Sequence, residues 1–496
     1  MDRANGAGGG PGGPALTALL GQNHYLPAGS GTVPAHAILT VEAEGLGPLA
    51  RRAESAEVIV IDCSGSMSSP RTKIAAARRA AAAAVDVLRD GTRFALIEGT
   101  DRARVVYPRT ERMAVAGPDS RADAAHVASG LVAAGGTAIA GWLDCAHRLL
   151  AAQDTPIRHA LLLTDGRNEH DRPGELERVL SACAGRFRCD ARGIGEEWAA
   201  TELRAIAARL HGVADAVVDD SDLEAEFRTM MTGAMAKALP DVRIRVSVRD
   251  GSELRFVKQV FPTELDLTAE GVRTGKRSWE FPTGAWGDES RDFHLCVTAD
   301  PEGDPQGEEV RLASVALVTA GPEAAATPVA LPDPCPFTVR WTDDRALSTR
   351  VHPRVAHYDG HAELGRAVNA GCEAYERGEP GAAETAWGRA VRLAHELGDE
   401  KTLRRLRRLV TVADPARGEV RVRPGLSAGD LNAAWVTADH STQWTEETRP
   451  SPPPEEAPDR VCPDCTRRSV AGANVCTQCG HRFSPFSPPP PSGPSA

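Results

Sequence analysis

The chain has 496 residues, enough for roughly two to four domains, and a formal net charge of −11. This acidic balance argues against a protein that binds nucleic acid through bulk electrostatics. No apolar run reaches the roughly 18 residues of a membrane-spanning helix, so none is expected. Residues 1–13 lack an apolar core segment and do not resemble a signal peptide. Seven of the eleven cysteines are scattered, which indicates a reducing, cytoplasmic setting rather than a disulfide framework.

The first 54 residues predict one strand. Residues 1–23 are expected to be disordered, since they begin with a long glycine-rich stretch. Residues 24–54 contain the segment 35–43, in which apolar and polar side chains alternate as they do in a half-buried strand. We expect this segment to pair with strands that come later in the chain.

Residues 55–238 alternate between strand patterns and helix patterns. Strands are expected at residues 58–61, 94–98, 104–107, 160–164, 189–193 and 214–218. Helices are expected at residues 73–88, 122–133, 138–149, 174–182, 199–210 and 222–238. Repeated units of this kind predict an α/β domain with a doubly wound, Rossmann-like and mostly parallel sheet, covered by helices on both faces.

Residues 239–350 predict an all-β domain. Residues 242–248 alternate strictly between apolar and polar side chains, and short strand patterns follow after loops rich in Gly, Asp and Pro. This is typical of an antiparallel sandwich. Because residues 24–54 can contribute a strand to it, we expect the α/β domain to be inserted in a β-sandwich.

Residues 360–415 predict a helical hairpin, with residues 361–413 helical throughout. Small residues and one tryptophan recur at the spacing of a tetratricopeptide repeat: Gly371, Gly378, Ala383, Trp387 and Ala390. A single copy is visible, whereas an array of such repeats usually needs about three. A plain helical hairpin that docks on the sandwich therefore remains the alternative.

The remaining four cysteines form a patterned quartet within residues 459–484: Cys462, Cys465, Cys476 and Cys479. Two Cys-x-x-Cys pairs can offer four thiolates to one Zn²⁺ in a closed tetrahedral site, which would be structural rather than catalytic. The segment resembles the short zinc ribbons of bacterial proteins, and redox-active or disulfide-bonded pairs are the alternative. A Pro- and Glu-rich linker at 440–458 precedes it, and a disordered tail at 485–496 follows.

Polar oxygen-bearing residues follow two of the expected strands. Asp62, Ser64 and Ser66 come directly after the apolar run 58–61; Thr137 precedes an expected helix and Asp165 follows the strand at 160–164. The carboxyl ends of parallel strands are where ligands bind in such sheets. Carboxylate and hydroxyl oxygens suit Mg²⁺ or Mn²⁺ rather than zinc.

Taken together, Asp62-x-Ser64-x-Ser66, Thr137 and Asp165 resemble the metal-ion-dependent adhesion site (MIDAS) of von Willebrand factor A (VWA) domains. The resemblance implies that these five residues hold Mg²⁺ or Mn²⁺, directly or through water, with Ca²⁺ left open. It also implies that the cation accepts an Asp or Glu side chain from a protein partner. The abundance of Ala, Gly, Arg and Pro suggests a bacterial genome.

The sequence favours a non-enzymatic, cytoplasmic interaction or scaffold protein. Since domains of this family also serve AAA+ ATPases, the alternative is an adaptor subunit of such an ATPase or of a kinase and phosphatase signalling cluster. A hydrolase is a third reading. Neither Ser64 nor Ser66 lies in a Gly-x-Ser-x-Gly nucleophile elbow, and no motif places a His with an orienting acid beside them. Binding of nucleic acid is not expected.

Overall fold

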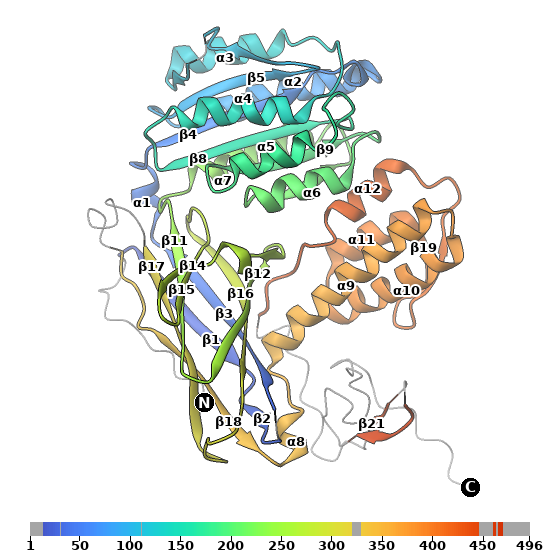
Figure 1. Cartoon of the computed structure of the whole chain (residues 1–496). Helices are drawn as coiled ribbons and strands as arrows, with labels where there is room; N and C mark the ends of the chain where they lie inside the picture. Colours follow the sequence, from blue (N-terminus) through green and yellow to red (C-terminus); the bar gives the residue numbers. More distant parts are fainter. Residues whose placement is uncertain are drawn as a thin grey trace.

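In the computed structural model, the residues described are 13–29, 31–110, 112–319, 329–445, 460–462 and 465–469. They form an α/β unit at the top of Figure 1, a pair of mainly antiparallel sheets below it, and a helical region at the right. None of the helices in these ranges combines the length and the apolar composition that a membrane crossing requires.

The α/β unit is built on a central sheet with the strand order β10-β9-β8-β4-β5-β6. Its strands are β4 (Ser55–Asp62), β5 (Arg93–Gly99), β6 (Ala103–Tyr107), β8 (Ile157–Thr164), β9 (Arg188–Ile194) and β10 (Ala214–Val217). Neighbours from β10 to β5 pair in parallel, while β6 and the short β7 (Ala114–Val115) run antiparallel to β5. The prediction of an α/β fold is thus confirmed.

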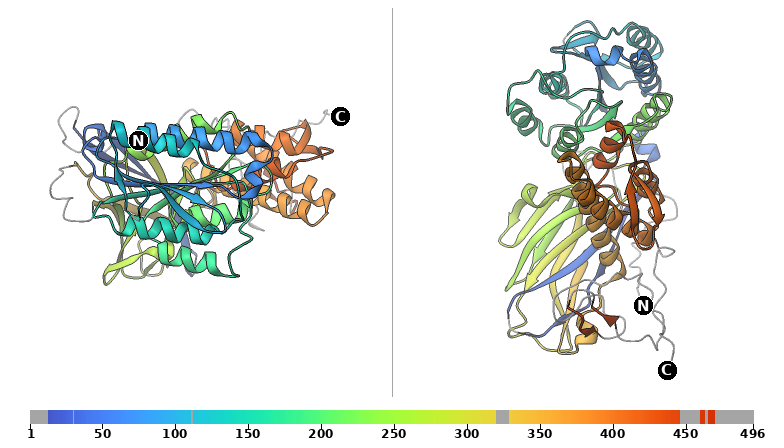
Figure 2. Two further views of the ribbon diagram at one scale, coloured as in Figure 1. Left: turned by 90° about the horizontal axis from the view of Figure 1, so that it is seen from above. Right: turned by 90° about the vertical axis from the view of Figure 1, so that its right-hand side faces the viewer.

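Helices cover both faces of the central sheet, as the view from above in Figure 2 shows. Because side chains alternate along a strand, β4 serves two cores. Val58 and Val60 pack with α4, α5 and α6, whereas Ile59 and Ile61 pack with α2, α3 and α7. The helices are α2 (Arg71–Asp86), α3 (Pro118–Ser129), α4 (Ile139–Ala151), α5 (Glu175–Cys183), α6 (Ala200–Arg209) and α7 (Leu223–Met235).

The pair of mainly antiparallel sheets shares one apolar core. One sheet has the order β1-β3-β16-β12-β13 and the other β14-β15-β11-β17-β18-β2. Buried Leu39 and Phe293 from the first sheet meet Ile244 and Phe337 from the second. The strands are β1 (Ala15–Gln22), β2 (Tyr25–Pro27), β3 (Val33–Glu44), β11 (Val242–Val248), β12 (Ser252–Phe261), β13 (Leu265–Asp266), β14 (Val272–Gly275), β15 (Ser278–Pro282), β16 (Glu289–Ala299), β17 (Glu309–Thr319) and β18 (Cys335–Thr342).

The N-terminal prediction of disorder is wrong for residues 15–22, which form β1. This strand pairs antiparallel with β3 over its whole length, from Ala15 opposite Glu44 to Gln22 opposite Ala37. Pairing satisfies its backbone groups and buries Leu16 in the shared core. Residues 1–12 of the segment predicted to be disordered lie outside the described residues.

The helical region follows the sheets and contains more than the expected hairpin. Its elements are α9 (Pro353–Glu376), α10 (Pro380–Leu397), α11 (Glu400–Leu409), β19 (Val410–Asp414), β20 (Glu419–Val422) and α12 (Ala428–Val436). Residues 410–413, expected to be helical, instead form β19, which pairs with β20. The β-branched residues Val410, Thr411 and Val412 favour this strand. Whether α9 and α10 are a tetratricopeptide repeat stays a prediction.

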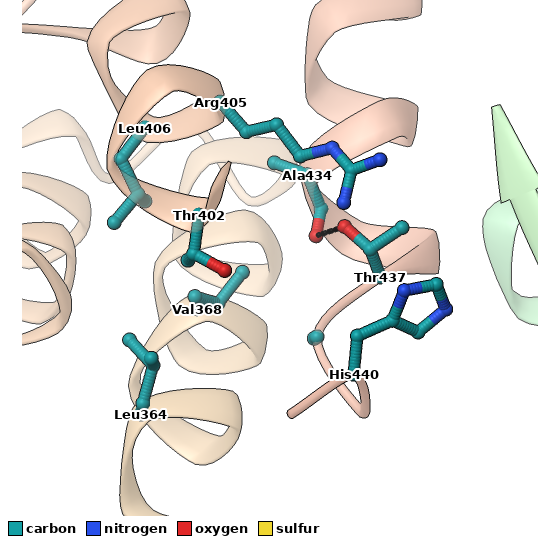
Figure 3. Close-up of a pocket in the computed structure, with 9 residues that line it drawn as sticks. Leu364, Val368, Thr402, Arg405, Leu406, Ala434, Thr437 and His440 are labelled. Carbon is teal, nitrogen blue, oxygen red and sulfur yellow. Dashed lines mark hydrogen bonds between the residues drawn. The ribbon is translucent and has the colours of Figure 1, made fainter. Parts of the chain in front are cut away.

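The helical region docks against the edge of the α/β unit beside β10. The Asn432 side chain donates a 2.7 Å hydrogen bond to the Trp198 carbonyl oxygen, and Arg405 donates to Asp215 at 2.8 Å. Within the helical region, next to this joint, lies a cavity of about 10 Å³, around which Figure 3 shows Arg405, Thr437 and His440. This volume accepts about one water molecule, so the cavity is a packing feature rather than a ligand pocket.

The prediction of a linker from residue 440 onward is wrong for residues 440–445, which pack against the rest of the protein. His440 lies with Nε2 3.0 Å from the Ala214 carbonyl oxygen of β10. The Ser441 N–H donates to the Pro262 carbonyl oxygen, and Trp444 stacks against the Arg354 guanidinium of α9. Residues 440–445 therefore join all three parts of the molecule. The remainder of that segment, 446–458, is outside the described residues.

Candidate metal centre

Three chain segments meet at the carboxyl end of the central sheet. β4 ends at Asp62, and its parallel neighbour β8 ends at Thr164, directly before Asp165. The loop before α4 joins them, since the Gly65 N–H donates to the Gly135 carbonyl oxygen at 2.9 Å. The tertiary structure thus brings together segments that are far apart in the sequence.

Asp62 is fully buried and held by groups from both strands. Its Oδ1 accepts from the Ser64 N–H at 2.8 Å, and its Oδ2 accepts from the Thr164 hydroxyl at 2.6 Å. Burial raises the pKa of the Asp62 carboxyl to about 6, although hydrogen bonds from Ser64 and Thr164 oppose the rise. The carboxylate is therefore fixed in one orientation below the surface of the site.

A chain of hydrogen bonds connects the first and the last part of the motif. Ser64 Oγ and Ser66 Oγ are 2.9 Å apart, and the Ser66 hydroxyl donates to Asp165 Oδ1 at 2.6 Å. Asp165 is completely buried. These oxygens are in direct contact although 99 positions separate Ser66 from Asp165.

Thr137 lies across Gly166 from Ser66. A Cβ on Gly166 would stand 2.9 Å from Thr137 Oγ1 and 3.7 Å from Ser66 Oγ. The two hydroxyls therefore border the same small space, which stays open because residue 166 has no side chain. Thr137 itself is buried, with 6% of its surface exposed.

Lys73 is a further member of the site that the sequence does not predict. It lies in the first turn of α2, and its Nζ is 2.8 Å from Asp165 Oδ2. Its side chain is only 9% exposed. The available signal is its spacing: Lys73 shares a helix face with Ala76 and Ala77, three and four positions on, and both are buried.

The chain after Asp165 clamps the start of α4. Asn168 Oδ1 accepts from the Ile139 N–H at 3.0 Å, and Asp171 Oδ2 accepts from the Ala140 N–H at 2.6 Å. These side chains satisfy backbone donors that a helix leaves open at its N-terminus. They thereby fix the loop that carries Thr137. Asn and Asp after a strand also occur in ordinary turns, so the sequence signal for this role is weak.

The oxygen set fits a hard divalent cation. It combines two carboxylates, Asp62 and Asp165, with hydroxyl oxygens, which are ligands that Mg²⁺ and Mn²⁺ accept. The open space at Gly166 is bordered by two of the hydroxyls, those of Ser66 and Thr137. Over the described ranges, no cluster of three or more His, Cys, Asp or Glu side chains is arranged to hold a metal ion. Any metal at this site would therefore depend on the hydroxyl oxygens.

The cysteine quartet falls only partly within the described residues. β21 (Arg460–Val461) pairs antiparallel with β22 (Arg468–Ser469), and the first Cys-x-x-Cys pair lies in the turn between them. Cys462 is fully buried in this turn. Outside the described residues lie Cys476 and Cys479. The zinc ribbon therefore stays a prediction.

Comparisons with known proteins agree with this fold. The model of the von Willebrand factor type A domain matches residues 56–216, and that of the von Willebrand factor type A C-terminal domain matches residues 392–431. A solved von Willebrand factor type A protein from Catenulispora acidiphila is 39% identical, with a TM-score of 0.78, over 87% of this chain and 98% of that chain. The chain belongs to the von Willebrand factor type A family.

Two more distant solved structures also match this chain. VWA2, the ArnB paralog from Sulfolobus acidocaldarius, is 13% identical over 86% of this chain and 98% of its own, with a TM-score of 0.48. Proximal thread matrix protein 1 from the mussel byssus, with a zinc occupied MIDAS motif, is 19% identical over 36% of this chain and 46% of its own, with a TM-score of 0.30. Neither likeness bears on the site of this chain. No curated protein matches the chain.

Proposed function

We propose that the α/β unit binds one divalent cation, Mg²⁺ or Mn²⁺, at the oxygens of five residues: Asp62, Ser64, Ser66, Thr137 and Asp165. The contact of 2.6 Å between Ser66 Oγ and Asp165 Oδ1 is the observation that carries this proposal. It brings a hydroxyl from the loop after β4 against a carboxylate from the loop after β8. The open cradle at Gly166 supports it further.

The cation would in turn accept a carboxylate from an acidic side chain of a protein partner. Mg²⁺ prefers an octahedral set of oxygens and usually keeps several waters, one of which a partner's Asp or Glu can replace. Domains of this family typically mediate protein–protein interaction. We therefore infer a non-enzymatic, cytoplasmic interaction or scaffold protein whose affinity for its partner depends on the metal.

Calorimetry tests the metal site. Titration of MgCl₂ and MnCl₂ into the full chain should give one binding event, which the double variant Asp62→Ala, Ser64→Ala loses. Asp86→Ala is the matched control, because Asp86 is an exposed carboxylate at the end of α2 and pairs with Arg228. Equal metal uptake by the wild type and the double variant would exclude the site.

A pull-down tests the partner. The partner should be retained by the wild type in Mg²⁺ and lost both in EDTA and with the double variant. Such a partner should carry an exposed acidic residue at the contact. Substitution of that acid by Ala in the partner should abolish binding. A partner that binds equally well in EDTA would use another surface.

An adaptor role is the second candidate, and one feature of the helical region favours it. Between α9 and α10 lies a groove of about 720 Å³, bordered by Glu363, Arg366 and Arg389. A second docking surface is what an adaptor of an AAA+ ATPase, or of a kinase and phosphatase cluster, requires. Copurification in Mg²⁺ and in EDTA tests this role, since an ATPase should be retained in Mg²⁺ and should leave when the cation is stripped.

The hydrogen bonds of the site support binding rather than catalysis. Ser64 and Ser66 engage each other and Asp165, and none of these contacts supplies the His base of a serine hydrolase. We infer that the protein is not an enzyme. Turnover of generic ester and phosphate substrates that disappears in Asp62→Ala would overturn this inference.

Two further parts of the architecture belong to the proposal. The pair of mainly antiparallel sheets forms a β-sandwich in which the α/β unit is inserted, and the C-terminal cysteine quartet holds one structural Zn²⁺. Elemental analysis of the purified chain should find about one zinc per molecule. The variant Cys462→Ser, Cys465→Ser should contain none.

A further inference from the structure

Lys73 contacts one of the five proposed metal ligands, Asp165. Its Nζ lies 2.8 Å from Asp165 Oδ2, while the other oxygen of the same carboxylate accepts the Ser66 hydroxyl at 2.6 Å. Both oxygens of Asp165 are thus engaged by groups of the protein. The ammonium of Lys73 balances the charge of this buried carboxylate.

The position of Lys73 is enclosed. Gly195 follows β9 directly and has a φ of +76°, and a Cβ there would stand 2.7 Å from Lys73 Cε and 2.9 Å from its Nζ. The Trp198 indole N–H donates to the Gly195 carbonyl oxygen at 3.1 Å and holds this wall in place. A lysine usually extends its ammonium into water, but here it is confined between Asp165 and Gly195.

We propose that Lys73 is a tethered counter-cation that competes with the divalent ion for Asp165. An ammonium next to a divalent cation repels it, so Lys73 lowers the affinity of the site for metal alone. A carboxylate from an acidic partner offsets this repulsion, and metal and partner therefore bind cooperatively. This inference rests on the metal site of the proposed function. It adds that the charge of Lys73 regulates the affinity of that site for metal.

The same ion pair lets the fold tolerate metal-free conditions. A buried carboxylate without a partner is costly, and two carboxylates that await a cation would destabilise the unit. With Lys73 in place, Asp165 keeps a partner when no metal is bound. Removal of the Lys73 charge should therefore make the stability of the unit depend on the metal.

Calorimetry of the full chain with MgCl₂ and MnCl₂ tests the proposal. Lys73→Met and Lys73→Gln should bind either ion about tenfold more tightly than the wild type, or more, because the repelling charge is gone. Lys73→Arg keeps the charge and should therefore not bind either ion more tightly than the wild type. Arg71→Met is the matched control, since it removes one exposed positive charge from the same turn of α2 and should leave the affinity unchanged.

Thermal denaturation gives the second readout. Lys73→Met should unfold at a lower temperature than the wild type in EDTA, and Mg²⁺ should raise its midpoint more than that of the wild type. If Lys73 had only a structural role, its removal would weaken metal binding rather than strengthen it.

The outcomes separate the two proposals. The proposed competition between Lys73 and the metal for Asp165 is wrong if Lys73→Met and Lys73→Gln fold but bind metal no more tightly than the wild type. The same holds if neither variant folds at any Mg²⁺ concentration, because the lysine is then purely structural. If the wild type and all variants take up neither ion, the proposed metal site itself is wrong.

Discussion

His159 and Glu57 form a buried ion pair across two neighbouring strands of the central sheet, with His159 Nδ1 2.8 Å from Glu57 Oε2. On its other side, His159 Nε2 lies 3.1 Å from Asp190 Oδ2 of β9. The three residues lie near the starts of β8, β4 and β9, at the opposite end of the sheet from the candidate metal site. They form a charged crosslink between three neighbouring parallel strands.

Removal of His159 should destabilise the α/β unit. His159→Gln leaves the buried Glu57 carboxylate without its cation, whereas Asp190 keeps its ion pair with Arg188. The loss of the partner of a buried charge costs about 3–5 kcal/mol. Urea denaturation followed by circular dichroism measures the free energy of unfolding. The exposed His126 of α3 provides the control, because His126→Gln should change this energy by less than about 0.5 kcal/mol. Equal stabilities of the two variants would contradict the crosslink.

The same residue predicts a dependence of stability on pH. Burial opposes the charged form of His159, but the attraction to Glu57 and the hydrogen bonds with Asp190 and Glu57 outweigh it and raise the pKa to about 9. Since this lies above the ordinary value of 6.5, the stabilisation is complete below about pH 6.5 and is lost as the pH rises through 9. Unfolding free energies of the wild type should fall across this window, and those of His159→Gln should fall less. Parallel curves would refute the assignment.

Gly166→Ala should block the candidate metal site without unfolding the protein. Its Cβ would approach Thr137 Oγ1 to 2.9 Å, which displaces that hydroxyl and fills the space between the Ser66 and Thr137 hydroxyls. Calorimetry should show Mg²⁺ affinity reduced by about tenfold or more, consistent with loss of about 1.4 kcal/mol. Gly141→Ala on α4 is the control, because a Cβ there meets nothing within 4 Å and alanine favours a helix.

Asn432→Ala should loosen the helical region from the α/β unit. The Asn432 side chain donates to the Trp198 carbonyl oxygen at 2.7 Å, and its loss leaves a buried acceptor unpaired at a cost of about 1–3 kcal/mol. Amide hydrogen exchange should rise in α12, while exchange in β4 and β8 stays as in the wild type. An unchanged α12 would show that other contacts hold the joint by themselves.

Local patterns predicted much of the α/β unit and its strand ends. The apolar run at 58–61 and the Asp62 carboxylate directly after it are neighbours in the chain, so periodicity and composition reveal them. The charged crosslink is different, because nothing in the sequence relates Glu57 to His159 before β4 and β8 pair in register. The same holds for Lys73, whose burial depends on the wall that Gly195 supplies from β9.

Predictions from composition failed where pairing over long distances decides the structure. Residues 15–22 follow a glycine-rich stretch and look unstructured alone, yet β3 supplies a partner for each of them. Residues 440–445 stand at the start of a polar segment, but they pack because β10, α9 and the loop after β12 surround them.

The sequence by itself determined the alternation of strands and helices, and it singled out the five oxygen-bearing residues by type and order. These features depend on neighbours in the chain, which a sequence displays. Only the tertiary structure decided that Ser66 touches Asp165, that Lys73 neutralises this carboxylate, and that the helical region closes on β10. Such contacts join residues far apart in the chain, and they exist only once the apolar faces of the sheet and helices have packed together.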